Sequence, residues 1–130
     1  MRPQRILHLN AVSTTACAIG MLATRGTLHP LFGLDSPVVL DVLAVGLLAY
    51  AGALVVAARR ETVDRPTMMA FAFVDALWVV ASAVVLSLYW GQFTLVARVL
   101  VIAVALVVEA FAALQYRAAG PAKSSTLGVA

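Results

Sequence analysis

The chain has 130 residues, enough for one compact unit, and 63% of them are hydrophobic while only 12% are charged. A soluble domain carries about 45–50% apolar and about 25% charged residues, so this composition excludes an ordinary water-soluble fold and predicts an outer surface that faces lipid. The net charge is +3, but the nine Lys and Arg form no dense run, so we expect no nucleic-acid partner.

Four apolar stretches follow one another along the chain, each close to the ~20 residues that a helix needs to cross a bilayer. We expect helices over residues 6–24, 38–58, 67–89 and 95–116. The segments 25–37, 59–66 and 90–93 contain Gly, Pro or charged residues and are expected to be loops. The prediction is an all-α integral membrane four-helix bundle of two antiparallel helical hairpins. It forms a single transmembrane domain over residues 1–119, followed by a mobile tail over residues 120–130.

The first stretch has a second interpretation, because Arg2 and Arg5 precede an apolar run as positive charges do in a signal peptide. Polar residues such as Asn10 interrupt that run, and its removal would leave an odd number of spans. We therefore favour a first transmembrane helix.

Positive charges predict the direction of the chain in the membrane. Seven of the nine Lys and Arg lie on one side if the chain crosses four times, and only Arg25 and Arg98 lie on the other. Because cytoplasmic segments are enriched in Lys and Arg, both termini are expected in the cytoplasm. The expected location is the bacterial inner (plasma) membrane, as a multi-pass protein.

The two predicted hairpins resemble each other in sequence. Asn10 aligns with Asp75 at an offset of 65 residues, and Arg59 aligns with Arg117 at an offset of 58. Both hairpins begin on the same side, so the internal repeat is of the parallel kind. Chance similarity between apolar helices is the alternative.

One polar residue in each predicted span lies at a similar depth. Asp75 and Glu109 are each eight residues, or ~12 Å, from the expected cytoplasmic end of their span. Tyr50 lies at about that depth and Asn10 slightly shallower. Charged groups inside a bilayer are costly, so these residues are candidates for a ligand or proton site, with Trp78 one helical turn beyond Asp75.

Two interpretations of this layer remain open. Two carboxyls in a medium of low dielectric cannot both ionise cheaply, so the layer would bind a proton, a cation or a cationic small molecule. The same groups can instead join the helices by hydrogen bonds. The expected function is accordingly a small membrane protein that binds or transports such a ligand. The alternative is a non-catalytic accessory or scaffold subunit.

Besides the lipid bilayer, the sequence leaves two assemblies open, a homodimer and a larger membrane complex. Asp41 and Arg98 begin the second and fourth spans, and we expect them to form a salt bridge there, with an external gate as the alternative. His8 and His29 lie near opposite ends of the first span, so neither a metal site nor a cofactor is expected. No nucleophile or metal motif favours an enzyme.

Several short runs carry a resemblance to known proteins. They are Arg5-Ile-Leu-His-Leu-Asn-Ala, Leu31-Phe-Gly-Leu, Asp75-Ala-Leu-Trp-Val-Val-Ala-Ser and Phe111-Ala-Ala-Leu-Gln-Tyr. Together they resemble small four-helix integral membrane proteins predicted in many bacterial genomes, which implies the fold and no particular activity. The chain is also similar in size and span number to small multidrug resistance transporters. Those carry an essential glutamate in the first span, where this chain has Asn10, whereas its glutamate, Glu109, is in the fourth.

Overall fold

A computed structural model of the chain describes residues 2–120, and every regular element in that range is an α-helix. The helices are α1 (Pro3–Ala23), α2 (Arg25–Leu31), α3 (Val38–Ala58), α4 (Arg65–Leu88) and α5 (Leu95–Ala119). These elements confirm the all-α prediction for the described residues. All the helices but α2 are long and apolar enough to span a membrane, which indicates a multi-pass membrane protein. Except for Gly120, the tail predicted to be mobile lies outside the described residues.

Local sequence determines where the long helices begin and end. The Asp64 side chain accepts a hydrogen bond from the backbone N–H of Thr67 (3.0 Å) and caps α4. The Thr94 hydroxyl caps α5 in the same way. Such caps satisfy amides that lack a partner in the first turn of a helix. After α5 comes Gly120, whose φ of +74° suits a residue without a Cβ.

The predicted loop between the first two spans contains a short helix, α2, so the loop prediction was wrong for that part. Thr24 is the one residue between α1 and α2, and its carbonyl accepts the N–H groups of Thr27 (2.9 Å) and Leu28 (2.8 Å). The helix therefore resumes at once. Pro30 stands in the last turn of α2, where its missing N–H removes only one helical hydrogen bond.

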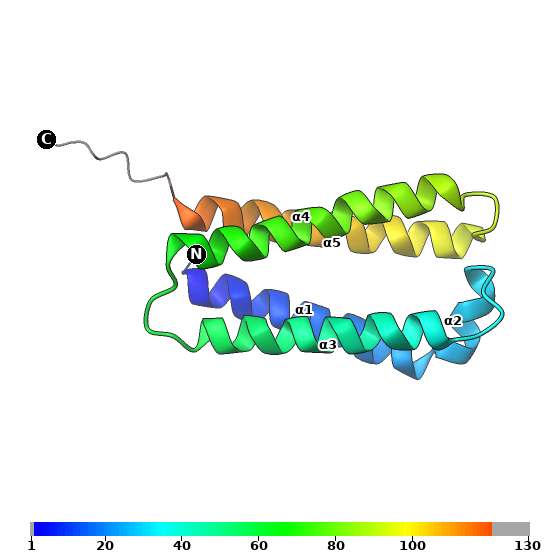
Figure 1. Ribbon diagram of the computed structural model, residues 1–130, viewed down its shortest axis with the longest axis horizontal. Helices are drawn as coiled ribbons and strands as arrows, with labels where there is room; N and C mark the ends of the chain where they lie inside the picture. The colour runs from blue at the N-terminus through cyan, green and yellow to red at the C-terminus, as the bar shows by residue number, and fades with distance from the viewer. Residues whose placement is uncertain (1, 121–130) are drawn as a thin grey trace, which may run out of the picture.

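The long helices pack as two pairs. α1 lies along α3, and α4 lies along α5, each pair antiparallel, whereas contacts between the pairs are fewer and run mainly between α1 and α5 (Figure 1). We call α1 with α3 the first hairpin and α4 with α5 the second hairpin. The terminal end of the molecule holds the start of α1, the α3–α4 connection and the end of α5, and the α2 end lies opposite (Figure 1).

The best-packed part of the interior lies toward the terminal end. A cluster of buried apolar side chains from α1, α3 and α4 joins the two hairpins there: Leu7, Ala11, Leu54, Ala57, Ala58 and Met68. The alanines let the helix backbones approach closely. We call this set the terminal core.

The outward faces of the long helices are apolar. Many of their large hydrophobic side chains are exposed, and only 11% to 28% of the most apolar window of each long helix is buried. Soluble monomers rarely expose apolar surface on this scale. The surface is thus of the kind that lipid tails, rather than water, would solvate.

At the α2 end, hydrogen bonds tie the loops of the two hairpins together. The backbone N–H of Thr94 donates to the carbonyl of Leu31 (3.0 Å), and Nε2 of Gln92 donates to the carbonyl of Gly33 (3.0 Å). The hairpins are therefore joined at both ends of the molecule.

Replacing Gly33 by alanine is expected to lower the free energy of unfolding by about 1–2 kcal/mol, because left-handed backbone is costly for other residues. Gly33 has a φ of +69°, and a Cβ there would clash with Cγ of Gln92. Gly26→Ala in α2 is the matched control, since its Cβ would meet no described atom within 4 Å, and it should leave stability unchanged or raised. SDS titration in mixed micelles measures both variants. Equal effects would contradict this account of the loop.

Candidate functional site

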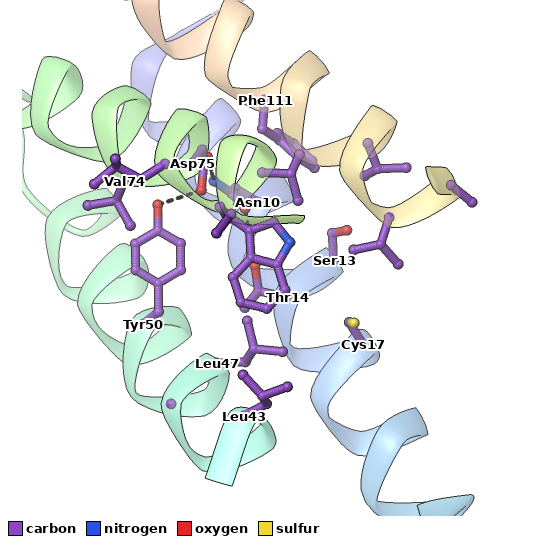
Figure 2. Close-up of a pocket in the computed structure, with 18 of the residues that line it drawn as sticks. Asn10, Ser13, Thr14, Cys17, Leu43, Leu47, Tyr50, Val74, Asp75 and Phe111 are labelled. Atoms are coloured by element: carbon purple, nitrogen blue, oxygen red, sulfur yellow. Dashed lines mark hydrogen bonds between the residues drawn. The ribbon is translucent and has the colours of Figure 1, made fainter. Parts of the chain in front are cut away.

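One polar side chain from each long helix meets its counterparts in the interior, beside the terminal core. Asp75 of α4 accepts hydrogen bonds from the Tyr50 hydroxyl (2.8 Å to Oδ1) and from Nδ2 of Asn10 (2.8 Å to Oδ2). It also accepts one from Nε2 of Gln115 (2.9 Å to Oδ2). Asn10 donates a second hydrogen bond, to Oε1 of Gln115 (2.7 Å). Figure 2 shows Asn10, Tyr50 and Asp75 pointing toward one another. We call these four residues the polar cluster.

Three residues of the polar cluster are buried, Tyr50 is half-buried, and their hydrogen-bonding groups are paired. The exposed fractions are 3% for Asn10, 4% for Asp75 and 0% for Gln115. An ionised carboxylate only accepts hydrogen bonds, so both amides turn their NH2 groups toward it. The remaining amide oxygen of Asn10 accepts from the Thr14 hydroxyl (3.1 Å). Bonds of this kind hold each helix at one rotation, so the cluster sets how the two hairpins face each other.

The Tyr50 hydroxyl has two acceptors within reach. It lies 2.8 Å from Oδ1 of Asp75 and 3.3 Å from the carbonyl of Phe71. It can donate to a carboxylate, or it can accept from a protonated carboxyl while donating to Phe71. The polar cluster therefore accommodates both forms of Asp75 without moving a helix.

The surroundings of Asp75 supply no counter-ion within the described residues. The side chains that bond to it come from α1, α3 and α5, and of these only the Tyr50 phenol can titrate. Across residues 2–120, the one salt bridge within 4.0 Å is between Arg25 and Asp41, so no Lys, Arg or His there pairs with Asp75. Hydrogen bonds alone hold this buried carboxyl.

Glu109 was predicted to join the layer, but its side chain is exposed and takes no part in the polar cluster. Val108, Phe111 and Gln115 follow the spacing of one face of α5, and that face is turned inward, whereas Glu109 is rotated ~100° from Val108. Counting depth from the ends of a span cannot tell which way a residue faces. Gln115, which depth counting missed, could have been found from its helical spacing with Phe111.

A cavity of about 620 Å³ lies between the two hairpins, next to the polar cluster and on its α2 side. Its wall is largely apolar, and the polar groups that reach it include Asp75, Asn10 and Tyr50 (Figure 2). Trp78 lines it one turn from Asp75, and Phe111 lines it from α5. The cavity therefore joins one buried carboxyl to an apolar space with aromatic walls.

Asp41 and Arg98 do not form the predicted salt bridge. Asp41 instead accepts from Nε of Arg25 (2.7 Å), because the unpredicted helix α2 begins with Arg25 close to the start of α3. Arg98 donates to the carbonyl of Trp90 (2.7 Å) and its guanidinium lies 4.2 Å from the centre of that ring. The Arg25–Asp41 pair is largely open to solvent, and such pairs contribute little to stability.

The remaining titratable side chains form no second centre in the described part of the chain. No three His, Cys, Asp or Glu residues gather there closely enough to hold a metal ion. His29 is hydrogen-bonded through Nδ1 to the carbonyl of Leu34 (2.9 Å), while His8 is exposed near the other end of α1. Cys17 is half-buried in the wall of the cavity.

Comparison with known proteins finds no match among protein families, curated proteins or solved structures. The available chemistry is therefore inferred from the polar cluster and the cavity. A buried carboxylate can hold a proton, or it can pair with a cation that brings apolar groups into the cavity. Aromatic faces nearby favour the second use, because they attract cations.

Proposed function

We propose that this protein is an integral membrane protein that binds an apolar cation in the cavity between its two hairpins, with Asp75 as the counter-ion. The observation that carries the proposal is the Asp75 carboxyl, which is 4% exposed and meets no cationic side chain within salt-bridge distance in residues 2–120. Ionisable groups inside a membrane are costly, and they commonly mark the binding sites and pathways of ions and ligands. The apolar cavity beside Asp75 offers room for that ligand.

The cavity has the dimensions and the groups that such a ligand needs. Its volume of about 620 Å³ is in the range of small-molecule sites, about 300–1,000 Å³. Trp78 and Phe111 offer aromatic faces to a cation. Oδ1 of Asp75 accepts one hydrogen bond, from Tyr50, although a carboxylate oxygen has room for two. Oδ1 can therefore take a further contact from a cationic ligand without displacement of the polar cluster.

A proton is expected to compete with the cation. Protonation removes the charge of Asp75, and the Tyr50 hydroxyl can then turn its hydrogen toward the carbonyl of Phe71, 3.3 Å away. Cation binding should therefore weaken as the pH falls. Passage of a ligand to the terminal end would require the terminal core to separate, because Leu7, Leu54 and Met68 are fully buried there.

The same proposal has the four long helices crossing a bacterial inner membrane as a bundle, with both termini in the cytoplasm. Their apolar outward faces support the crossing. The positive-inside rule supports the direction, because these residues lie at the terminal end: Arg2, Arg5, Arg59, Arg60, Arg65 and Arg117.

The internal repeat stays part of the proposal. A parallel repeat relates the two hairpins by a twofold axis, and equivalent residues of the two hairpins come close together where they lie near this axis. Asn10 and Asp75, which the repeat aligns, come from different hairpins and bond at 2.8 Å. This contact supports a parallel repeat of two hairpins whose axis passes close to the polar cluster.

Binding of tetraphenylphosphonium, a lipophilic cation, tests the proposal. The full chain in detergent is titrated with the probe, and the Kd is compared for wild type, Asp75→Asn and Glu109→Gln. Asp75→Asn should raise the Kd at least about tenfold, and lowering the pH from about 8 to about 5 should weaken binding by wild type. Glu109→Gln removes a carboxylate from the exposed face of α5 and should leave the Kd unchanged.

Equal affinity of wild type and Asp75→Asn would show that Asp75 is not the counter-ion. An equal loss in Glu109→Gln would assign binding to the net charge of the protein rather than to the cavity. Absence of cation binding together with a stoichiometric partner on native purification would favour an accessory subunit instead.

A further inference from the structure

A hollow of about 520 Å³ opens at the terminal end, apart from the cavity between the hairpins. It is lined by the first turns of α1 and by the connection between α3 and α4. The lining residues are Arg2, Gln4, Arg5, His8, Arg60 and Glu61. We call it the basic hollow. The cation site uses none of these residues.

The fold gathers these side chains from distant parts of the sequence. Gln4 in the first turn of α1 donates through Nε2 to the carbonyl of Glu61 (2.7 Å) and to that of Arg60 (3.3 Å). These bonds fasten the α3–α4 connection to α1. The Arg60 backbone is thereby held close to the start of α1, and Arg2, Arg5 and Arg60 all line the one hollow.

The acids near the basic hollow balance its positive charge only in part. Three arginines line it against one acid, Glu61, and Asp64 lies close enough to Arg60 to interact with its charge. Across residues 2–120 the sole salt bridge is between Arg25 and Asp41, far along the chain at the α2 end. No side chain caps the start of α1, so the partial positive charge of its first amides adds to that of the arginines. Like charges gathered in this way favour a bound anion.

We propose that the basic hollow binds the phosphate of an anionic phospholipid headgroup. The long apolar helices end at this level, which is where a bilayer carries its headgroups. Arginine binds phosphate oxygens through two parallel N–H groups, and basic hollows at the cytoplasmic side of membrane helices suit anionic lipids. This inference rests on membrane insertion and is independent of cation binding at Asp75.

Native mass spectrometry of the full chain tests the inference. Detergent-solubilised protein receives dioctanoyl phosphatidylglycerol, dioctanoyl phosphatidylcholine or both, with inorganic phosphate as a competitor. The double variant Arg5→Gln/Arg60→Gln removes two positive charges from the lining of the basic hollow. Arg59→Gln with Arg117→Gln removes the same charge from the same end, outside the hollow.

Wild type and the Arg59/Arg117 variant should retain phosphatidylglycerol at least about fivefold more than phosphatidylcholine, and the Arg5/Arg60 variant should lose this preference. If that variant does not fold, Arg2→Gln, which removes one charge before α1, is compared with Arg59→Gln alone. Equal retention of the two lipids by wild type would overturn the inference. So would an equal loss in both double variants, or displacement of phosphatidylglycerol by an equal concentration of inorganic phosphate, which would mark a free-phosphate site.

Discussion

Replacing Asp75 by alanine is expected to lower the free energy of unfolding by about 2–4 kcal/mol. The substitution removes the carboxyl group that accepts three hydrogen bonds. The donors of Asn10, Tyr50 and Gln115 then lose this acceptor inside the protein. A buried donor without a partner costs about 1–3 kcal/mol, and in a membrane part of that cost is recovered by new partners. SDS titration in mixed micelles measures the change.

The variant Asp75→Asn shows whether the shape or the charge of this side chain matters for stability, because asparagine keeps the shape and removes the charge. The asparagine oxygen can take the place of Oδ2, and its NH2 group can donate to the Tyr50 hydroxyl, which then donates to Phe71. Stability should therefore stay within about 1 kcal/mol of wild type. An alanine variant as stable as wild type would show that the polar cluster does not join the hairpins. An asparagine variant as unstable as alanine would mean that the charge itself is needed.

Replacing Gly46 by phenylalanine is expected to weaken tetraphenylphosphonium binding at least about tenfold. Gly46 lines the cavity one helical turn before Tyr50, on the same face of α3. A Cβ at this position meets no described atom within 4 Å, so the ring can enter the space that the ligand needs without displacing the backbone. The helix should also become slightly more stable, because glycine is a poor helix former.

Gly52→Phe is the matched control for this substitution. Gly52 stands in the same helix and also has no described atom within 4 Å of a built Cβ, but it does not line the cavity. Its variant should bind the probe with wild-type affinity. Equal Kd values for wild type and Gly46→Phe, in folded protein, would place the ligand outside the cavity.

The long helices were predictable because their cause is local. Each long helix is a stretch of apolar residues bounded by Pro, Gly or charged residues, and the predicted limits of the second one are those of α3, residues 38–58. The limits of the others differ by a few residues, since caps such as Asp64 and Thr94 act at the last turn. α2 was not predicted because Gly26 and Pro30 both disfavour helix. The helix forms nonetheless, because α1 ends at Ala23 and the carbonyl of Thr24 accepts the first hydrogen bonds of α2.

The candidate site was predictable only in part. Asn10, Tyr50 and Asp75 were chosen for their common depth, and the structure brings these three together. Glu109 met the same criterion, yet Gln115 bonds to Asp75 in its place. The depth of a residue in the membrane follows from its position along a helix. The direction in which its side chain points depends on the rotation of α5 about its axis, and packing against the other helices sets that rotation.

The sequence by itself determined four long apolar helices, a positively charged terminal end and two acids, Asp75 and Glu109, within the apolar stretches, because hydrophobicity and charge are properties of the residues. Only the tertiary structure decided that Asp41 pairs with Arg25, that Gln115 completes the polar cluster, and that a cavity separates the hairpins. These features depend on which faces of the helices meet, and an apolar surface all around a helix does not specify that.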